Sequence, residues 1–154
     1  MVYLSNRAYL QMTAEIAVFD DLETGGLLLG RRDGGDIMIA EAVCGGPHAV
    51  RERCSFEYDP AYAVYEIGLL TRMYNEQKLE VLGVWHKHNH ACTPPFSEAD
   101  RGMHAQALRQ LETSEIISLL FQKAGDEQYL LAAYLITTHG EAEIELEFSP
   151  SGKL

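Results

Sequence analysis

The N-terminal part of the chain changes from helical to strand spacing of its apolar residues. Apolar side chains three or four positions apart predict an amphipathic helix from residue 5 to about 21. The apolar segments 25–32 and 37–43 lie on either side of Asp-Gly-Gly-Asp, a sequence typical of a tight turn, so they predict two strands paired as a hairpin. The chain is therefore expected to begin with a helix followed by a β-hairpin.

The middle of the chain is expected to hold a buried strand between two helices. Residues 54–60 predict a short strand that ends at Pro60. The sequence from 78 to 88 is rich in β-branched and apolar residues and predicts a mostly buried central strand. A third helix is expected from Ser97 to about Glu112. The apolar faces of the second and third helices are formed by Ala63, Ile67, Leu70 and Tyr74 and by Met103, Ala107 and Leu111, respectively.

Three apolar segments near the C-terminus, 115–123, 128–138 and 141–148, are separated by short turns and predict a three-stranded antiparallel meander. In the last segment, glutamates alternate with apolar residues, which is typical of a strand with one solvated face. This alternation alone explains the acidic run, so we do not interpret it as a metal site. Together the elements predict an α/β fold with a mixed, mostly antiparallel sheet flanked by helices. One domain is expected over residues 1–148, followed by a flexible tail at 149–154.

The composition limits the partners and the compartment of the protein. The 154 residues include 12 Lys and Arg against 23 Asp and Glu, a net charge of −11, which repels the phosphate backbone of nucleic acids. The longest apolar run, residues 129–136, is far shorter than the roughly 20 residues of a membrane-spanning helix. No secretory signal pattern opens the chain, and its 3 cysteines contain no Cys-x-x-Cys pair. We therefore expect a cytoplasmic protein with reduced cysteines and no nucleic-acid or membrane partner.

His86 and His88 lie at the end of the predicted central strand. Because side chains two positions apart on a strand point to the same side, both imidazoles would face one way and Lys87 the other. Catalytic zinc commonly has three protein ligands and leaves a fourth position for water. Asp100, in the first turn of the third helix, could be the third ligand. These residues therefore form a candidate zinc site.

Each part of this site also has an ordinary structural explanation. Ser97 and Asp100 form a capping-box-like pattern at the start of the third helix, with Asp in place of the usual Glu. A His-x-His pair alone occurs in several metal folds and by chance. The spacing after His88 does not match a metallo-β-lactamase or a cupin site, and the chain lacks the Pro-Cys-x-x-Cys of zinc base deaminases. It is the combination of the histidines, the serine and the aspartate that favours a catalytic site.

The complete pattern is His86-x-His88, eight residues, then Ser97-x-x-Asp100, and Glu-Thr-Gly-Gly-Leu-Leu-Leu-Gly precedes it at 23–30. This combination resembles the JAMM metalloprotease family, also called MPN+ or JAB, with its H-x-H, S-x-x-D and E-x-x-G-x-L-x-G motifs. The resemblance covers most of the chain and implies a cytidine-deaminase-like JAB/MPN fold. Because the chain has no room for the long insertions of eukaryotic deubiquitinating members, it resembles the compact prokaryotic JAB domains.

The resemblance implies a role for each matched residue. His86, His88 and Asp100 would bind Zn2+, and Glu23 would be the general base that activates a zinc-bound water. Zinc lowers the pKa of such a water toward neutrality, and a nearby carboxylate can pass the proton to the leaving amine. Ser97 would donate a hydrogen bond to the oxyanion, an interaction whose loss typically costs on the order of 100-fold in rate.

Residues beside the histidines depart from the family pattern or lie outside it. The family usually has His-Ser-His-Pro, where this chain has His-Lys-His-Asn from residue 86. Lys87 is expected on the strand face away from the zinc, and Asn89 is expected to loosen the turn after the second ligand. His90 is expected to be a solvent-facing loop residue. Cys92 is expected to be a loop thiol, with a redox-sensitive plug of the open zinc position as the alternative.

The function that the resemblance implies is hydrolysis of a peptide or isopeptide bond after the C-terminal Gly-Gly of a ubiquitin-like or sulfur-carrier-like protein. A narrow trench beside the metal admits only a backbone without side chains, which explains a Gly-Gly requirement. Two alternatives stay open, namely a zinc hydrolase of small peptides or cell-wall peptides and a non-catalytic MPN-type interaction scaffold. The intact set of ligands and base argues against the scaffold, because buried polar groups without a partner cost stability.

Overall fold

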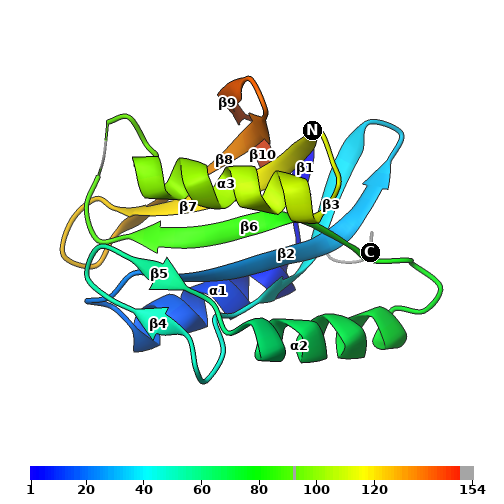
Figure 1. Ribbon diagram of the computed structural model, residues 1–154, viewed down its shortest axis with the longest axis horizontal. Helices are drawn as coiled ribbons and strands as arrows, with labels where there is room; N and C mark the ends of the chain where they lie inside the picture. The colour runs from blue at the N-terminus through cyan, green and yellow to red at the C-terminus, as the bar shows by residue number, and fades with distance from the viewer. Residues whose placement is uncertain (92, 150–154) are drawn as a thin grey trace.

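The computed structural model describes residues 1–91 and 93–149, which form an eight-stranded mixed sheet with helices on both faces (Figure 1). The strands of this sheet are β1 (Val2–Leu4), β2 (Thr24–Asp33), β3 (Asp36–Val43), β6 (Glu80–His88), β7 (Glu115–Lys123), β8 (Tyr129–Thr137), β9 (Gly140–Ile144) and β10 (Leu146–Phe148). The helices are α1 (Asn6–Val18), α2 (Pro60–Met73) and α3 (Glu98–Gln110). A separate two-stranded ladder consists of β4 (Val50–Arg51) and β5 (Phe56–Glu57).

The strand order in the large sheet is β10-β1-β3-β2-β6-β7-β8-β9. The pairs β2–β3, β2–β6, β7–β8 and β8–β9 are antiparallel, and β1–β3, β1–β10 and β6–β7 are parallel. Glu145 alone separates the two edge strands β9 and β10 along the chain, so the sheet is nearly closed. The predictions of a mixed, mostly antiparallel sheet, of the N-terminal hairpin and of the central strand β6 are confirmed.

The prediction of one strand over 141–148 is wrong. β9 ends at Ile144, and β10 pairs in parallel with β1 on the opposite edge of the sheet, with Val2 opposite Leu146 and Leu4 opposite Phe148. The side chains do not form one solvated and one buried face, because Phe148 is 52% exposed. The alternating pattern could not reveal this break, since the partner strand β1 is only 3 residues long and carries no periodicity of its own.

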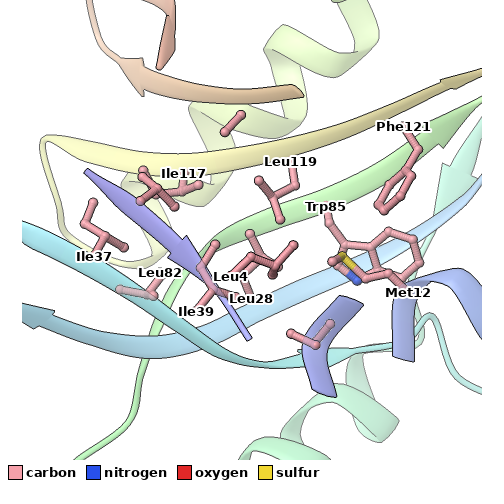
Figure 2. Close-up of a cluster of buried hydrophobic side chains, with 14 of the residues drawn as sticks. Leu4, Met12, Leu28, Ile37, Ile39, Leu82, Trp85, Ile117, Leu119 and Phe121 are labelled. Carbon is pink, nitrogen blue, oxygen red and sulfur yellow. The ribbon is translucent and has the colours of Figure 1, made fainter. Parts of the chain in front are cut away.

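The largest apolar cluster lies between α1 and the sheet (Figure 2). α1 contributes the buried side chains of Ala8, Met12 and Ile16. The strands contribute residues that include Leu4, Leu28, Ile39, Leu82, Trp85, Ile117, Leu119 and Phe121. Removing one such side chain from water contributes about 1.5–3 kcal/mol to folding, so this cluster fixes α1 against one face of the sheet.

The opposite face of the sheet is covered by α2 over β2 and β3 and by α3 over β7 and β8. Leu70 of α2 packs with Leu29 in one cluster, and Leu108 of α3 packs with Leu120 in another. The predicted face of α2 is confirmed. In α3 the buried residues are His104 and Leu108, whereas the predicted positions Met103, Ala107 and Leu111 are only half-buried. The centre of the buried face of α3 therefore lies one residue further along the chain than predicted.

The ends of the elements agree with the predictions within a few residues, except for very short strands. Ser5 caps α1 and Asp59 caps α2 with side-chain oxygens that accept backbone N–H groups. Of the predicted strand 54–60, only β5 forms, and its partner β4 was not predicted. Ser149 is buried and its N–H donates to Leu4 O, so it belongs to the fold, while the rest of the predicted tail lies outside the described residues. No helix in the described ranges is long and apolar enough to cross a membrane.

Candidate metal centre

His86 and His88 end β6, a strand that lies between β2 and β7 in the middle of the sheet. Both imidazoles are buried and point to the face covered by α2 and α3, and their Nε2 atoms lie 3.0 Å apart. Trp85 and Lys87 point to the other face, toward α1. The strand alternation predicted from the sequence is therefore confirmed at these positions.

Asp100 reaches this pair from the first turn of α3. Its Oδ1 lies 3.5 Å from His86 Nε2, and its Oδ2 lies 3.3 Å from His88 Nε2. Asp100 Oδ2 also accepts hydrogen bonds from Ser97 N (2.7 Å) and Ser97 Oγ (2.8 Å), while Ser97 Oγ accepts one from Asp100 N. The capping box is thus present, and it holds the Asp100 carboxylate toward the two histidines.

The three side chains fit a tetrahedral metal ion. A zinc ion bound to nitrogen and oxygen at roughly 2.0–2.1 Å places its ligand atoms about 3.3 Å from one another. The observed separations of 3.0, 3.3 and 3.5 Å lie close to this value. One ligand atom from each of His86, His88 and Asp100 lies within 4.8 Å of the other two. Two imidazoles and one carboxylate also match the donor set of catalytic zinc and leave a fourth position open.

The protonation states favour a bound cation. Burial lowers the pKa of His86 to about 3, so this ring is neutral at physiological pH and offers a lone pair. Burial acts to raise the pKa of Asp100, but hydrogen bonds from His88 and Ser97 and the proximity of His86 outweigh it, so the pKa lies well below its usual range. Within the described residues, Nδ1 of both histidines is buried without a hydrogen-bond partner, which leaves the converging Nε2 atoms as the metal-binding ones. Neutral imidazole and ionised carboxylate are the forms that bind metals.

Glu23 stands beside this site at the start of β2. Thr24 pairs with Lys87 and Gly25 with His86, which places Glu23, the residue before Thr24, beside His88. Because side chains alternate along a strand, Glu23 shares the sheet face of the two imidazoles. Its side chain is buried, and burial raises its pKa, with Asp100 adding to this effect and His88 opposing it. A carboxyl group with a raised pKa is suited to take up and release a proton near neutral pH.

The glycines of the 23–30 segment have a structural explanation. A Cβ at Gly26 would lie 1.8 Å from Val43 O, and a Cβ at Gly30 would lie 1.8 Å from Met38 O. No real Cβ atom tolerates such distances, so only glycine allows β3 to pass this close to β2. A Cβ at Gly25 would lie 2.3 Å from Trp85 O and 2.9 Å from His86 Cβ, so this glycine lets β2 lie close to the part of β6 that carries His86.

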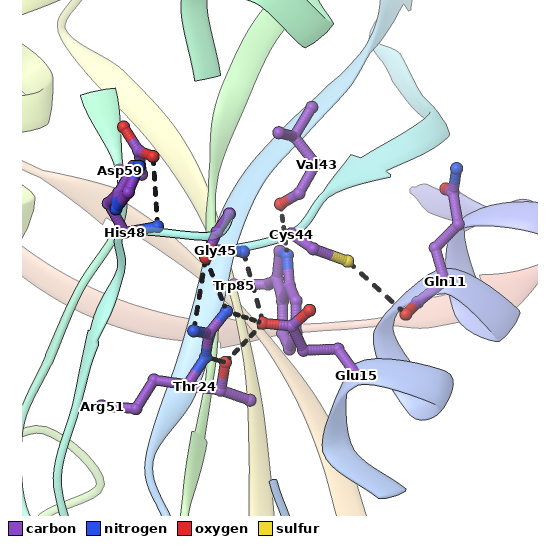
Figure 3. A network of polar contacts seen from close by, with 11 residues as sticks. Gln11, Glu15, Thr24, Val43, Cys44, Gly45, His48, Arg51, Asp59 and Trp85 are labelled. Carbon is purple, nitrogen blue, oxygen red and sulfur yellow. Dashed lines mark hydrogen bonds and ion pairs between the residues drawn. The ribbon is translucent and has the colours of Figure 1, made fainter. Parts of the chain in front are cut away.

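A largely buried polar network lies around Thr24, the residue after Glu23 (Figure 3). Arg51 Nη2 and Glu15 Oε1 form an ion pair of 2.7 Å, Thr24 Oγ1 donates to Glu15 Oε1 (2.7 Å), and Arg51 Nε donates to Thr24 Oγ1 (3.0 Å). In addition, Glu23 N donates to Glu52 O at 2.7 Å. The network connects α1, β2 and β4. Sequence reasoning missed it because its members come from three separate segments.

His104 is a further residue near the site that the sequence analysis did not identify. It is buried on α3, four positions after Asp100, with its ring centroid 6.4 Å from that of His86 and 4.7 Å from that of Phe96. Its Nε2 lies 3.1 Å from Ser118 Oγ, and burial lowers its pKa. The helical spacing from Asp100 was a signal that could have placed it on the same side of α3.

The structure tests the expectations for the residues beside the histidines. Asn89 was expected to loosen the turn, but its Nδ2 donates to Asp21 O (3.1 Å) and Arg53 O (2.8 Å), so it ties two loops together. The expectation was wrong because a side-chain amide can bridge carbonyls that proline cannot reach. His90 is exposed, as predicted. The prediction for Cys92 lies outside the described residues.

Comparisons with known proteins support the fold alone. No family model and no curated protein matches the chain. Among solved structures, the chain is similar to the solution structure of protein DSY2949 from Desulfitobacterium hafniense, with a TM-score of 0.74 and 22% identity. The similarity covers 99% of this chain and 96% of that one. At this identity the similarity shows that the two chains share a fold, and it carries no functional assignment.

Proposed function

We propose that this protein is a zinc-dependent peptidase or isopeptidase of the JAMM (MPN+, JAB) type. The observation that carries the proposal is the convergence of His86, His88 and Asp100, whose ligand atoms are separated by 3.0–3.5 Å, beside the buried carboxylate of Glu23. The motif resemblance adds support, and with it we propose the cytidine-deaminase-like JAB arrangement for the mixed sheet and its helices.

In the proposed reaction His86, His88 and Asp100 would hold the zinc ion. When bound, zinc lowers the pKa of a coordinated water toward neutrality and polarises the scissile carbonyl. Glu23 accepts the proton of the attacking water and delivers it to the leaving amine, a role supported by the direction of its pKa shift. The exposed Ser97 hydroxyl donates to the oxyanion after its hydrogen turns away from Asp100 Oδ2, which lies 2.8 Å from it.

The proposed substrate is a ubiquitin-like or sulfur-carrier-like protein cut after its C-terminal Gly-Gly. This choice rests on the motif resemblance. A cleavage assay tests it directly: a fusion joined through Gly-Gly to a folded ubiquitin-like domain is compared with free short peptides at equal concentration. Faster cleavage of the fusion supports the proposal. Cleavage of the free peptides alone would replace it by the small-peptide hydrolase, and no cleavage by a zinc-loaded chain would favour the scaffold.

Metal analysis provides the matching test of the site. Wild type is expected to carry one zinc per chain after dialysis, measured by atomic mass spectrometry, whereas His88→Ala is expected to carry less than a tenth of that amount. His139→Ala is the matched control, because His139 is exposed and far along the chain from the site. Equal zinc in His88→Ala and wild type would contradict the proposed centre.

A substrate trap tests the role of Glu23 and identifies the partner. Glu23→Gln keeps the shape of the side chain and all proposed zinc ligands but cannot take up a proton. It is expected to bind zinc as wild type does, to lose turnover, and to retain from native lysate a small protein ending in Gly-Gly or a conjugate of one. Turnover equal to wild type would contradict the assignment of Glu23 as the base.

A further inference from the structure

Lys87 is a buried lysine between the two proposed zinc ligands, and its ammonium group lies on the other face of the sheet. The residue is 0% exposed. Its Nζ donates to Phe19 O at 2.8 Å and to Asp20 O at 2.6 Å, and it lies 5.7 Å from the centroid of the Tyr129 ring. A buried ammonium with two carbonyl acceptors and an aromatic face is well satisfied.

These two carbonyls belong to Phe19, the C-cap residue of α1, and to Asp20, the residue that follows it. The carbonyls of a last helical turn lack partners within the helix and carry a partial negative charge that favours a nearby cation. The last turn of α1 contains no basic residue of its own. Lys87 therefore supplies from β6 the positive charge that α1 lacks.

The segment that Lys87 holds leads directly to Glu23. Phe19 and Asp20 are followed by Asp21, whose carbonyl accepts from Asn89 Nδ2 at 3.1 Å. The Asp20 carboxylate accepts a hydrogen bond of 2.8 Å from the Tyr129 hydroxyl. The end of β6 thus alternates in function: its histidines face the metal centre, and Lys87 faces the segment that brings Glu23 to that centre.

We propose that Lys87 is a positioning residue that fixes the 19–23 segment and thereby sets the place of the Glu23 carboxylate relative to His86 and His88. This inference rests on the proposed function of Glu23. Lys87 replaces the serine that the family usually has between its histidines, and its side chain points away from the proposed zinc ligands, toward Phe19 O and Asp20 O.

The test compares Lys87→Met, which removes both hydrogen bonds at similar length, with Lys123→Met. Lys123 is a matched control because its side chain is partly exposed and its Nζ lies 3.4 Å from the Asp20 carboxylate. Among the residues that the structure describes, Lys123 Nζ donates to no backbone carbonyl. With the Gly-Gly fusion as substrate, Lys87→Met is expected to lower kcat about 10–100-fold with KM within about twofold, because misplacing a reacting group by an ångström has effects of this order. Zinc content is expected to stay at the wild-type level.

Two further readouts separate positioning from general destabilisation. Amide hydrogen exchange of the metal-free chain is expected to become about tenfold faster in Lys87→Met over residues 19–24, with β6 and β7 unchanged. In the Glu23→Gln background, Lys87→Met is expected to cause less than about a twofold further loss, because Lys87 acts through Glu23. If Lys87→Met does not fold, Lys87→Gln, which keeps an N–H donor, is used and is expected to retain intermediate activity.

Different outcomes overturn different claims. Wild-type kcat in Lys87→Met, exchange that increases evenly over the whole chain, or a full multiplicative loss in the double variant each overturns the role of Lys87. Wild-type activity in Glu23→Gln instead contradicts the proposed function itself, and the exchange data then show only whether Lys87 holds the segment.

Discussion

His86 Nε2 and His88 Nε2 lie 3.0 Å apart, close enough for one neutral ring to donate a hydrogen bond to the other. Both atoms also face the Asp100 carboxylate, so a bound dication would replace this contact by three ligand bonds. An ion that binds only the folded chain stabilises it by about 2.7 kcal/mol at 100 times Kd. Because 1 kcal/mol raises the Tm of a domain of this size by roughly 2–4 °C, we expect zinc to raise Tm by roughly 5–11 °C over the chelated protein.

Variants with and without the proposed zinc ligands show whether zinc raises the Tm by binding at this site. His88→Ala is expected to show less than a third of the shift under the same free zinc concentration, and His139→Ala the full shift. Equal shifts in His88→Ala and wild type would mean that zinc stabilises the chain from another place.

The stability of the metal-free chain is expected to depend on pH through His86. Its pKa is lowered by burial from 6.5 to about 3, so between these values the unfolded chain binds a proton that the folded chain does not. The free energy of unfolding therefore falls as pH decreases below 6.5, by about 1–2 kcal/mol between pH 6.5 and pH 5. Above pH 6.5 this contribution is fully present.

Urea unfolding at pH 6.5, 6.0, 5.5 and 5.0 measures this dependence. His86→Gln, whose side chain cannot be protonated, is the comparison. Its free energy of unfolding is expected to fall by about 1–2 kcal/mol less than that of wild type between pH 6.5 and pH 5.0. This window lies above the pKa of an ordinary aspartate, so Asp100 stays ionised in both states. Parallel curves for the two proteins would show that His86 is protonated equally in the folded and the unfolded chain.

The convergence of His86, His88 and Asp100 could be predicted from sequence because the geometry that brings them together is local. Two histidines on one strand share a face by alternation, and Asp100 lies in the first turn of the next helix, positioned by Ser97. The partners of Lys87 and Arg51 could not be predicted in the same way. Lys87 binds carbonyls 67 and 68 positions away, and Arg51 pairs with a glutamate 36 positions away.

Short strands limited the prediction of the sheet in a similar way. β1 and β10 are 3 residues each and pair only with strands far along the chain, so neither shows a pattern that distinguishes it from a loop or from the end of a longer strand. The glycine positions in 23–30 were recognised as a motif. The reason that glycine is needed at Gly26 and Gly30 is the close approach of the β3 backbone, which the sequence alone does not reveal.

Gly26→Ala tests that reason. The added Cβ would lie 1.8 Å from Val43 O, a backbone atom of β3 that cannot rotate away, and 3.0 Å from Trp85 Nε1. We expect a loss of about 2–4 kcal/mol in the free energy of unfolding by urea, as for other overpacked positions. Gly102→Ala is the control, because it lies in α3 with nothing within 4 Å of the added Cβ and is expected to stabilise by about 0.5–1 kcal/mol. Similar effects of both changes would contradict the close-packing explanation.

Arg51 and Glu15 are expected to contribute more to stability than the surface pair Arg101 and Glu141. The first pair has side chains only 10% and 11% exposed and a hydrogen bond to Thr24, whereas the second is 43% and 22% exposed. Removing one partner of a buried pair leaves the other charge desolvated, so Arg51→Met is expected to cost about 3 kcal/mol in urea unfolding. Arg101→Met is expected to cost less than about 1 kcal/mol, because solvent screens an exposed pair. Equal costs would show that the Arg51 network near Glu23 is as weakly coupled to the fold as a surface contact.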